Sequence, residues 1–178
     1  MLLGLALFFV GAVLCLNGIW LLGKIGDGEI AVIDVLVGFV TLLVSLYFAF
    51  GPGANGATIK AATLTLLFTF TYFWVAWNRW SRADGRGLGW FCLFVAITTI
   101  PVFLQTFATA ASVWDVWFGI CWLSWGVLWF LFFLILALGW TRLIWITGAI
   151  CALQGVYTGW IPGYLLLNGS IPGGPPLS

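Results

Sequence analysis

The chain has 178 residues, of which 63% are hydrophobic and only 6% are charged, and its net charge is +1. Because soluble domains carry about 25% charged residues, this composition excludes a soluble globular protein and indicates an integral membrane protein. Neither the net charge nor any cluster of basic residues points to a nucleic acid as a partner.

Six apolar runs follow one another along the chain, at residues 2–22, 31–50, 61–77, 88–109, 116–138 and 143–167. About 20 apolar residues are enough to cross the ~30 Å hydrocarbon core as a helix, and the alternating pattern of membrane β-strands is not present. The first run has no basic segment before it and no cleavage site, so we keep it as a span. We therefore predict an all-α integral membrane protein of six transmembrane helices, with a single domain at 1–167 and a Pro/Gly-rich tail at 168–178.

The basic residues indicate how the six spans are oriented. An even number of spans places both termini on the same side of the membrane. Only Lys60 shares that side, whereas the other five basic residues fall on the opposite one: Lys24, Arg79, Arg82, Arg86 and Arg142. Because cytoplasmic loops carry the excess of Lys and Arg, we predict extracytoplasmic termini and cytoplasmic loops after spans one, three and five.

Ionisable and metal-binding groups are scarce within the apolar runs. Asp34 lies one turn into the second run and Asp115 lies at the outer end of the fifth, so both are expected to reach interfacial water. The chain has no histidine, and its four cysteines lie in apolar runs without a CxxC pair. Proton pumps and intramembrane hydrolases need titratable groups at depth. The sequence therefore predicts no catalytic residue, no metal site and no cofactor, so the protein is not expected to be an enzyme.

Tryptophan in membrane proteins usually lies at the membrane–water interface, but the stretch WLSWGVLW places three tryptophans deeper in the fifth run. At ~1.5 Å per residue, Trp125 and Trp129 lie about 13 and 20 Å inside the span. Together with Trp122 they share a helix face about 60° wide. The fifth span therefore presents an aromatic ridge at depth.

The third run has a similar aromatic pattern in FTYFWVAW, where Phe70, Trp74 and Trp77 form a stripe of similar width. The two ridges are expected either to face each other across a narrow slot or simply to pack together. Asn17 and Gln154 add hydrogen-bonding groups at depth. Moving an unpaired amide into an apolar medium costs about 2–7 kcal/mol, whereas a bare ion costs tens. A slot of this kind would suit small, neutral, planar polar solutes rather than ions.

Proline and glycine mark special positions in the fourth and sixth runs. Pro101 and Pro162 each remove a helix hydrogen bond and can kink their spans. In GVYTGWIPG, Gly155, Gly159 and Gly163 recur every four residues, a spacing that suits close packing against another helix.

Five stretches carry a resemblance to a known family: LGLALFFVGAVLCLNGIW, LTLLFTFTYFWVAWN, GWFCLFVAITTIP, WLSWGVLW and YTGWIPGYLLL. Together they resemble the urea channel and short-chain amide transporter family (UreI/AmiS type). The resemblance implies a bacterial inner-membrane protein with six spans and both termini outside. It also implies three helical hairpins that form a pore within each protomer, and a ring of six such protomers.

The resemblance further implies which side chains line the pore. Aromatic and leucine side chains form two constrictions in the structurally known branch of the family. Matched motif by motif, the lining here comprises Leu7, Leu14, Asn17, Phe70, Trp74, Trp122, Trp125, Leu128 and Trp129. Gln154 of the sixth span is expected to contribute hydrogen bonds.

Two departures make the chain resemble the amide-transporter branch more closely. Urea channels that open in acid carry a long, histidine-containing outer loop between spans two and three, where this chain has only GPGANGATIK. They also carry a glutamate in span six, where this chain has Gln154. The motifs GKIGDGEIAVI and DGRGLGWFCLFV point the same way, and the amide branch tends to accompany amidases. The resemblance thus implies no histidine-based acid gating and a functional link to a cytoplasmic amidase or urease.

The predicted function is passive passage of short-chain aliphatic amides or urea through a channel in the inner membrane. Two alternatives stay open. One is a secondary transporter that couples amide uptake to protons, for which only Asp34 could serve. The other is a membrane assembly subunit that transports nothing. Urea and acetamide-like solutes are not distinguished, because both are planar and differ by one methyl-for-amino replacement.

Overall fold

The computed structural model describes residues 1–171, which form helices joined by short connections. The first five spans are single helices: α1 (Leu2–Leu21), α2 (Asp27–Phe50), α3 (Gly56–Ser81), α4 (Arg86–Ala108) and α5 (Val113–Leu136). The sixth span is composite and consists of a 3₁₀ turn (Thr141–Leu143), α6 (Ile144–Gln154), a π-helical segment (Gly155–Trp160) and α7 (Ile161–Leu167).

These six spans are all long and apolar enough to cross a membrane. The prediction of an all-helical, six-span membrane protein is therefore confirmed. Of the tail predicted at 168–178, the part from residue 172 onward lies outside the described residues.

Two of the spans begin earlier along the chain than hydropathy suggests, because a side chain caps the first turn of each. The Asn55 side chain accepts hydrogen bonds from the backbone N–H groups of Ala57 and Thr58, so α3 begins before the apolar run at 61–77. Ser112 and Asp115 form a reciprocal capping box at the start of α5. Asp115 thus lies at the end of its span, as predicted, and serves to begin the helix.

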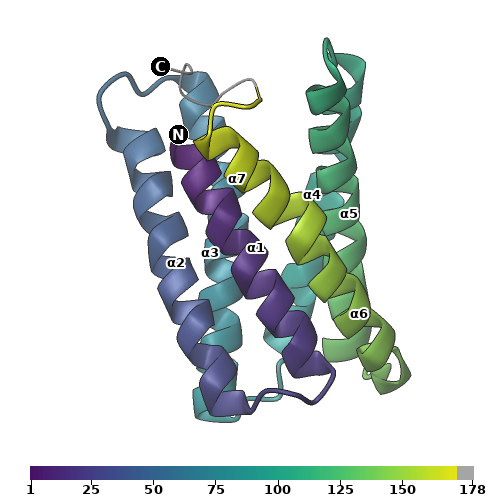
Figure 1. The fold of residues 1–178 in the computed structure, drawn as a ribbon. Helices are drawn as coiled ribbons and strands as arrows, with labels where there is room; N and C mark the ends of the chain where they lie inside the picture. Colours follow the sequence, from purple (N-terminus) through teal and green to yellow (C-terminus); the bar gives the residue numbers. More distant parts are fainter. Residues whose placement is uncertain (172–178) are drawn as a thin grey trace.

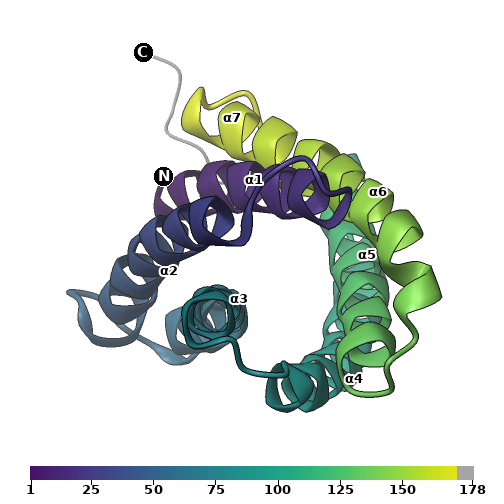
Figure 2. The ribbon, with the colours of Figure 1, turned by 90° about the horizontal axis from the view of Figure 1, so that it is seen from below.

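The spans alternate in direction, with α1 and the sixth span inclined to the others, and the N-terminus and the end of α7 lie at the same end of the bundle (Figure 1). Seen along the bundle, α1 to α6 are arranged in a ring (Figure 2). Within it the closest packing joins α2 to α3, α4 to α5, and α1 to the sixth span. The last of these contacts closes the ring between the beginning and the end of the chain.

Glycine allows α1 and the sixth span to approach closely. A Cβ atom added to Gly159 would lie 2.4 Å from the Cα of Gly11, and one added to Gly163 would lie 2.4 Å from the backbone nitrogen of Phe8. The predicted role of the regularly spaced glycines in close helix packing is confirmed. Across the same contact, the thiols of Cys15 and Cys151 donate to backbone carbonyls of the opposite helix.

Of the two prolines expected to perturb helices, only Pro162 follows an interruption. Pro101 lies inside α4, which continues through it. Pro162 comes directly after the π-helical segment Gly155–Trp160. In this segment the carbonyl of Tyr157 accepts a hydrogen bond from the indole of Trp117 in α5, at 3.0 Å. The interruption thus supplies a backbone acceptor to the neighbouring span.

Candidate permeation path

Three cavities lie in series between α1, α3 and α5, and we name them by their position along the bundle. The outer cavity, nearest the N-terminus, has a volume of about 290 Å³ and is lined by residues that include Leu7, Phe68 and Trp125. The middle cavity is about 40 Å³ and shares Phe68 and Trp125 with the outer one. The inner cavity is about 50 Å³ and shares Trp20 and Thr71 with the middle one. The shared residues show that the three cavities adjoin one another in a row, and we call this row, with the two sets of side chains that separate the cavities, the candidate path.

The constriction between the outer and middle cavities is a cluster of aromatic rings. The ring of Phe68 lies 4.9 Å from that of Trp125 and 4.7 Å from that of Trp129, between centroids. Trp122 completes the cluster, at 6.2 Å from Phe68 and 5.0 Å from Trp125. Trp125 lies at the midpoint of α5, so the deep tryptophans predicted from the sequence are indeed at the centre of the span.

Two of the three indole N–H groups at this constriction are engaged within the protein. Trp125 donates to the hydroxyl of Thr158 at 2.8 Å, and Trp129 donates to the hydroxyl of Thr71 at 3.2 Å. Because these donors are satisfied within the protein, the path meets mainly the faces and edges of the rings. The polar atom of each indole thus fixes its ring in place.

Two predicted lining residues, Phe70 and Trp74, do not lie on this path. Their side chains are 49% and 38% exposed, and they line an open groove on the outer surface together with Trp77. The expectation that their stripe faces the tryptophans of α5 is therefore wrong for the isolated protomer. At about 100° per residue, Phe68 and Phe70 point to opposite sides of α3. The helix carries aromatic residues on both faces, and the aromatic stripe alone does not reveal which face turns inward.

The remaining predicted residues of α1 and α5 are brought to the path. Leu7 lines the outer cavity, and Leu14, Asn17, Leu128 and Trp129 line the middle one. Trp122 lines the outer cavity beside Trp125. All of these except Trp122 are buried.

Gln154 lies behind the path rather than on it. Its Nε2 donates to the carbonyl of Ser124 at 2.9 Å, which ties the sixth span to α5. Its Oε1 is buried without a hydrogen-bond partner among the described residues, and Gln154 lines none of the three cavities. The structure therefore gives no direct contact by which Gln154 would bind a solute in the path.

The sequence interpretation missed several residues of α3 that line the path, notably Thr71, Tyr72 and Val75. The sequence contained a partial signal, because Thr71 and Tyr72 are polar residues in a mainly apolar stretch. Thr69 carries the same signal but bonds to Thr41 of α2, so hydroxyl groups alone do not identify the inward face. The Tyr72 hydroxyl is buried and has no hydrogen-bond partner among residues 1–171.

Asp34 does not reach interfacial water, and that prediction is wrong. Its exposed fraction is 0%, and its Oδ1 accepts a hydrogen bond from Nδ2 of Asn17 at 3.0 Å. The reason is that α2 begins at Asp27, so Asp34 lies about 10 Å along the helix and faces α1. An ionisable side chain thus lies at depth, directly behind a residue that lines the middle cavity.

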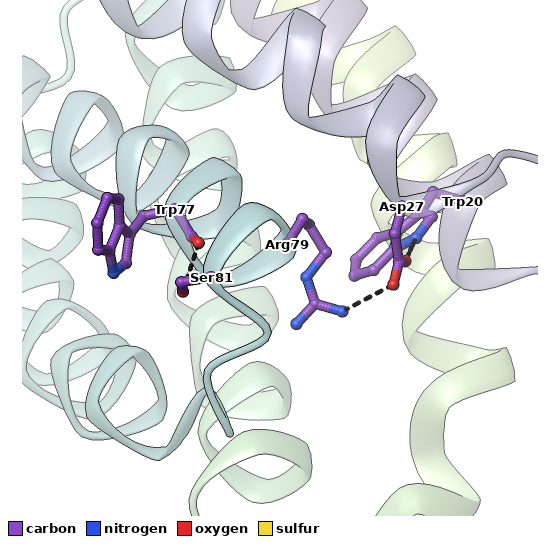
Figure 3. A network of polar contacts seen from close by, with 5 residues as sticks. All are labelled: Trp20, Asp27, Trp77, Arg79 and Ser81. Atoms are coloured by element: carbon purple, nitrogen blue, oxygen red, sulfur yellow. Dashed lines mark hydrogen bonds and ion pairs between the residues drawn. The ribbon is translucent and has the colours of Figure 1, made fainter.

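A polar arrangement borders the inner end of the path (Figure 3). Trp20 donates its indole N–H to Oδ1 of Asp27 at 2.8 Å, and Arg79 places Nη1 3.8 Å from Oδ2 of the same carboxylate. The guanidinium of Arg79 also lies over the ring of Trp20, at 5.1 Å from its centroid. Both Trp20 and Arg79 line the inner cavity. This arrangement connects α1, α2 and α3 at the end of the bundle that carries most of the basic residues.

A sequence model of AmiS/UreI family transporters matches residues 2–170. The chain is 40% identical over 172 residues to a protein that is named as an amidate substrates transporter of Mycolicibacterium smegmatis, and the alignment covers 97% of this chain and 79% of the relative. It is 34% identical over 191 residues to the acid-activated urea channel of Helicobacter pylori, with coverage of 92% and 96%.

Solved structures give the same result. The crystal structure of the Helicobacter pylori urea channel superposes with a TM-score of 0.82 at 33% identity, over 96% of this chain and 99% of the channel. A cryo-EM structure of the urea channel in its closed state gives a TM-score of 0.83 at 32% identity, over 95% and 99%.

Proposed function

The chain belongs to the AmiS/UreI family of transporters, and on that premise we propose that it is a channel for the passive passage of small, neutral, planar amides. The permeants would be short-chain aliphatic amides and urea. The observation that carries the proposal is the series of three cavities that meet at a constriction of aromatic rings, in which the N–H donors of Trp125 and Trp129 are engaged elsewhere.

The walls of the path suit such solutes and exclude ions. A planar amide can lie against the ring faces of Phe68 and Trp125 and direct its N–H groups at them. The loss of water costs an amide about 2–7 kcal/mol, which a few hydrogen bonds can offset, whereas a bare ion would lose tens. Binding of this kind is also weak enough to allow release, as conduction requires.

The features that this chain shares with the amide-transporter branch support a channel that is not gated by histidine. The chain contains no histidine, and Gln154 stands where acid-opened urea channels carry a glutamate. A neutral amide at this position does not titrate. Neither a histidine nor the side chain at position 154 would therefore make the opening of the channel depend on acid.

The setting we propose is the bacterial inner membrane, with both termini outside and a ring of identical protomers, six by family resemblance. Support for the orientation comes from Lys24, Arg82, Arg86 and Arg142, which lie at the end of the bundle away from the N-terminus. Downhill flux of an amide continues only while the solute is removed inside the cell. A cytoplasmic amidase or urease would supply that step.

The direct test is solute flux into proteoliposomes, followed by stopped-flow light scattering for urea, formamide, acetamide and glycerol. Planar solutes should pass faster than glycerol, which is similar in size but not flat. Trp125→Ala and Trp129→Ala should change both permeability and selectivity. Trp145→Ala is the matched control, because Trp145 is 71% exposed and lines none of the three cavities. Unchanged flux in both Trp125→Ala and Trp129→Ala would falsify the assigned path.

A proton-coupled transporter is the second candidate, and the burial of Asp34 is the observation that favours it. An ionisable residue inside a membrane protein is expensive and often functional. Coupled uptake should collapse when an uncoupler is added, and Asp34→Asn should abolish the effect of the uncoupler. Wild-type flux that is the same with and without a pH gradient would exclude coupling. Membership of a transporter family removes the third alternative, a subunit that transports nothing.

A further inference from the structure

Asn17 and Asp34 form a buried pair between α1 and α2, next to the middle cavity. Nδ2 of Asn17 donates to Oδ1 of Asp34 at 3.0 Å. The other carboxylate oxygen, Oδ2, is buried and has no partner among the described residues. Asn17 lines the middle cavity and Asp34 does not. Asp34 therefore acts on the cavity through the side chain of Asn17.

The chemistry of the carboxylate decides which way Asn17 points. Oδ1 of Asp34 accepts the hydrogen bond, whereas the amide of Asn17 has one donating end and one accepting end. Turning this amide over would place two acceptors against each other, at the cost of a buried hydrogen bond. The amino end of Asn17 must therefore face Asp34. Its carbonyl oxygen, Oδ1, accepts no hydrogen bond from residues 1–171 and is left for the cavity.

The rest of the middle cavity has the same accepting character. The indole N–H groups of Trp125 and Trp129 are engaged, and the Thr71 hydroxyl and the Cys151 thiol donate to backbone carbonyls. Ring faces also carry the negative side of the aromatic quadrupole. Among the side chains of this wall, the Tyr72 hydroxyl is the donor without a partner. The cavity is thus matched to solutes that bring N–H donors with them.

Resting on the proposed function, we propose that Asp34 is a positioning residue that sets the selectivity of the channel for N–H-bearing amides. It holds the carbonyl oxygen of Asn17 toward the middle cavity, where that oxygen accepts an N–H of the passing solute. The solute class is therefore primary amides and urea. Amides whose nitrogen is fully substituted find no partner at Asn17.

The experiment compares the permeability of proteoliposomes to formamide, N-methylformamide and N,N-dimethylformamide, of which the last carries no N–H group. In Asp34→Asn the residue at this position can donate as well as accept, so Asn17 is free to turn over. Formamide permeability should fall about five-fold, the factor that corresponds to one hydrogen bond, and the ratio of formamide to N,N-dimethylformamide permeability should fall with it. Thr41→Val is the matched control: Thr41 is equally buried in α2 but bonds to Thr69 of α3, so the ratio should stay as in the wild type.

A double-mutant cycle separates positioning from direct contact. Asn17→Ala should lower the ratio to a similar extent, and adding Asp34→Asn to it should change nothing further. A further loss in the double variant, or an unchanged ratio in Asp34→Asn alone, would overturn the proposal. Wild-type vesicles no more permeable than protein-free vesicles would instead contradict the proposed function. If Asp34→Asn does not purify as a folded protein, Asp34→Ser takes its place with the same expected outcomes.

Discussion

The indole N–H of Trp125 donates to the hydroxyl of Thr158 at 2.8 Å, so the central ring of the constriction is anchored to the π-helical segment of the sixth span. Thr158 in turn donates to the carbonyl of Gln154. Thr158→Val would leave a buried donor without a partner, which costs about 1–3 kcal/mol. We expect a lower melting temperature of the purified protein. Thr98→Val should leave it unchanged, because the Thr98 hydroxyl is exposed and bonds only within its own helix.

The two phenylalanines on opposite faces of α3 should behave differently when shortened. Phe68→Leu removes the ring that contacts three tryptophans, so the constriction widens. Urea permeability should rise, and glycerol should begin to pass, as measured by vesicle swelling. Phe70→Leu removes a ring of the same size from the groove on the outer surface of the protomer, away from the path. It should leave the urea and glycerol permeabilities unchanged. Equal effects of the two substitutions would mean that the path does not run along the Phe68 face.

The carboxylate of Asp27 holds the side chain of Trp20 at the border between the middle and inner cavities. In Asp27→Ala the indole loses this anchor, and we expect urea permeability to increase. Stability should change little, because an exposed ion pair such as that with Arg79 contributes about 0–1 kcal/mol. Glu29→Ala is the control, since Glu29 lies in the same first turn of α2 but takes no part in this arrangement. A permeability that is the same in both variants would count against a constriction at Trp20.

The contact between α1 and the sixth span should require glycine at the positions where the two helices meet, because a Cβ atom does not fit there. A Cβ atom at Gly11 would lie 2.2 Å from the backbone nitrogen of Trp160, so Gly11→Ala must push the two helices apart. Overpacking of this kind costs about 1–3 kcal/mol, and the fraction of protein that elutes as a single folded species should fall. Gly28→Ala should elute as the wild type does, because no atom lies within 4 Å of the added Cβ.

Features that depend on length and local spacing could be predicted from the sequence. The six spans follow from the apolar runs, and the depth of Trp125 follows from its distance along the fifth run. The close packing of the sixth span follows from the four-residue spacing of its own glycines, although that spacing does not identify α1 as the partner. Each of these needs only the rise and the period of a helix, which do not depend on the neighbouring spans.

Features that depend on how a helix is rotated in the bundle could not be predicted. In α3 both faces carry aromatic side chains, and only the packing against α2 and α5 selects Phe68 over Phe70 as the inward residue. The burial of Asp34 has a similar origin. Hydropathy places the start of the second span too late, and the partner that stabilises the carboxylate, Asn17, lies on a different helix. Contacts between helices leave little trace in a single sequence.

The constriction at Phe68 and Trp125 has a consequence for the energy supply of a cell that carries this protein. Protons move through a channel along an unbroken chain of hydrogen-bonded water molecules. Between the outer and middle cavities the path is bounded by ring carbons, and the indole N–H groups of Trp125 and Trp129 are already bonded within the protein. In the proposed channel a flat neutral molecule would slide past such rings, whereas a water chain would be interrupted there. We therefore expect the channel to admit amides without conducting protons, so that nutrient uptake would not discharge the membrane.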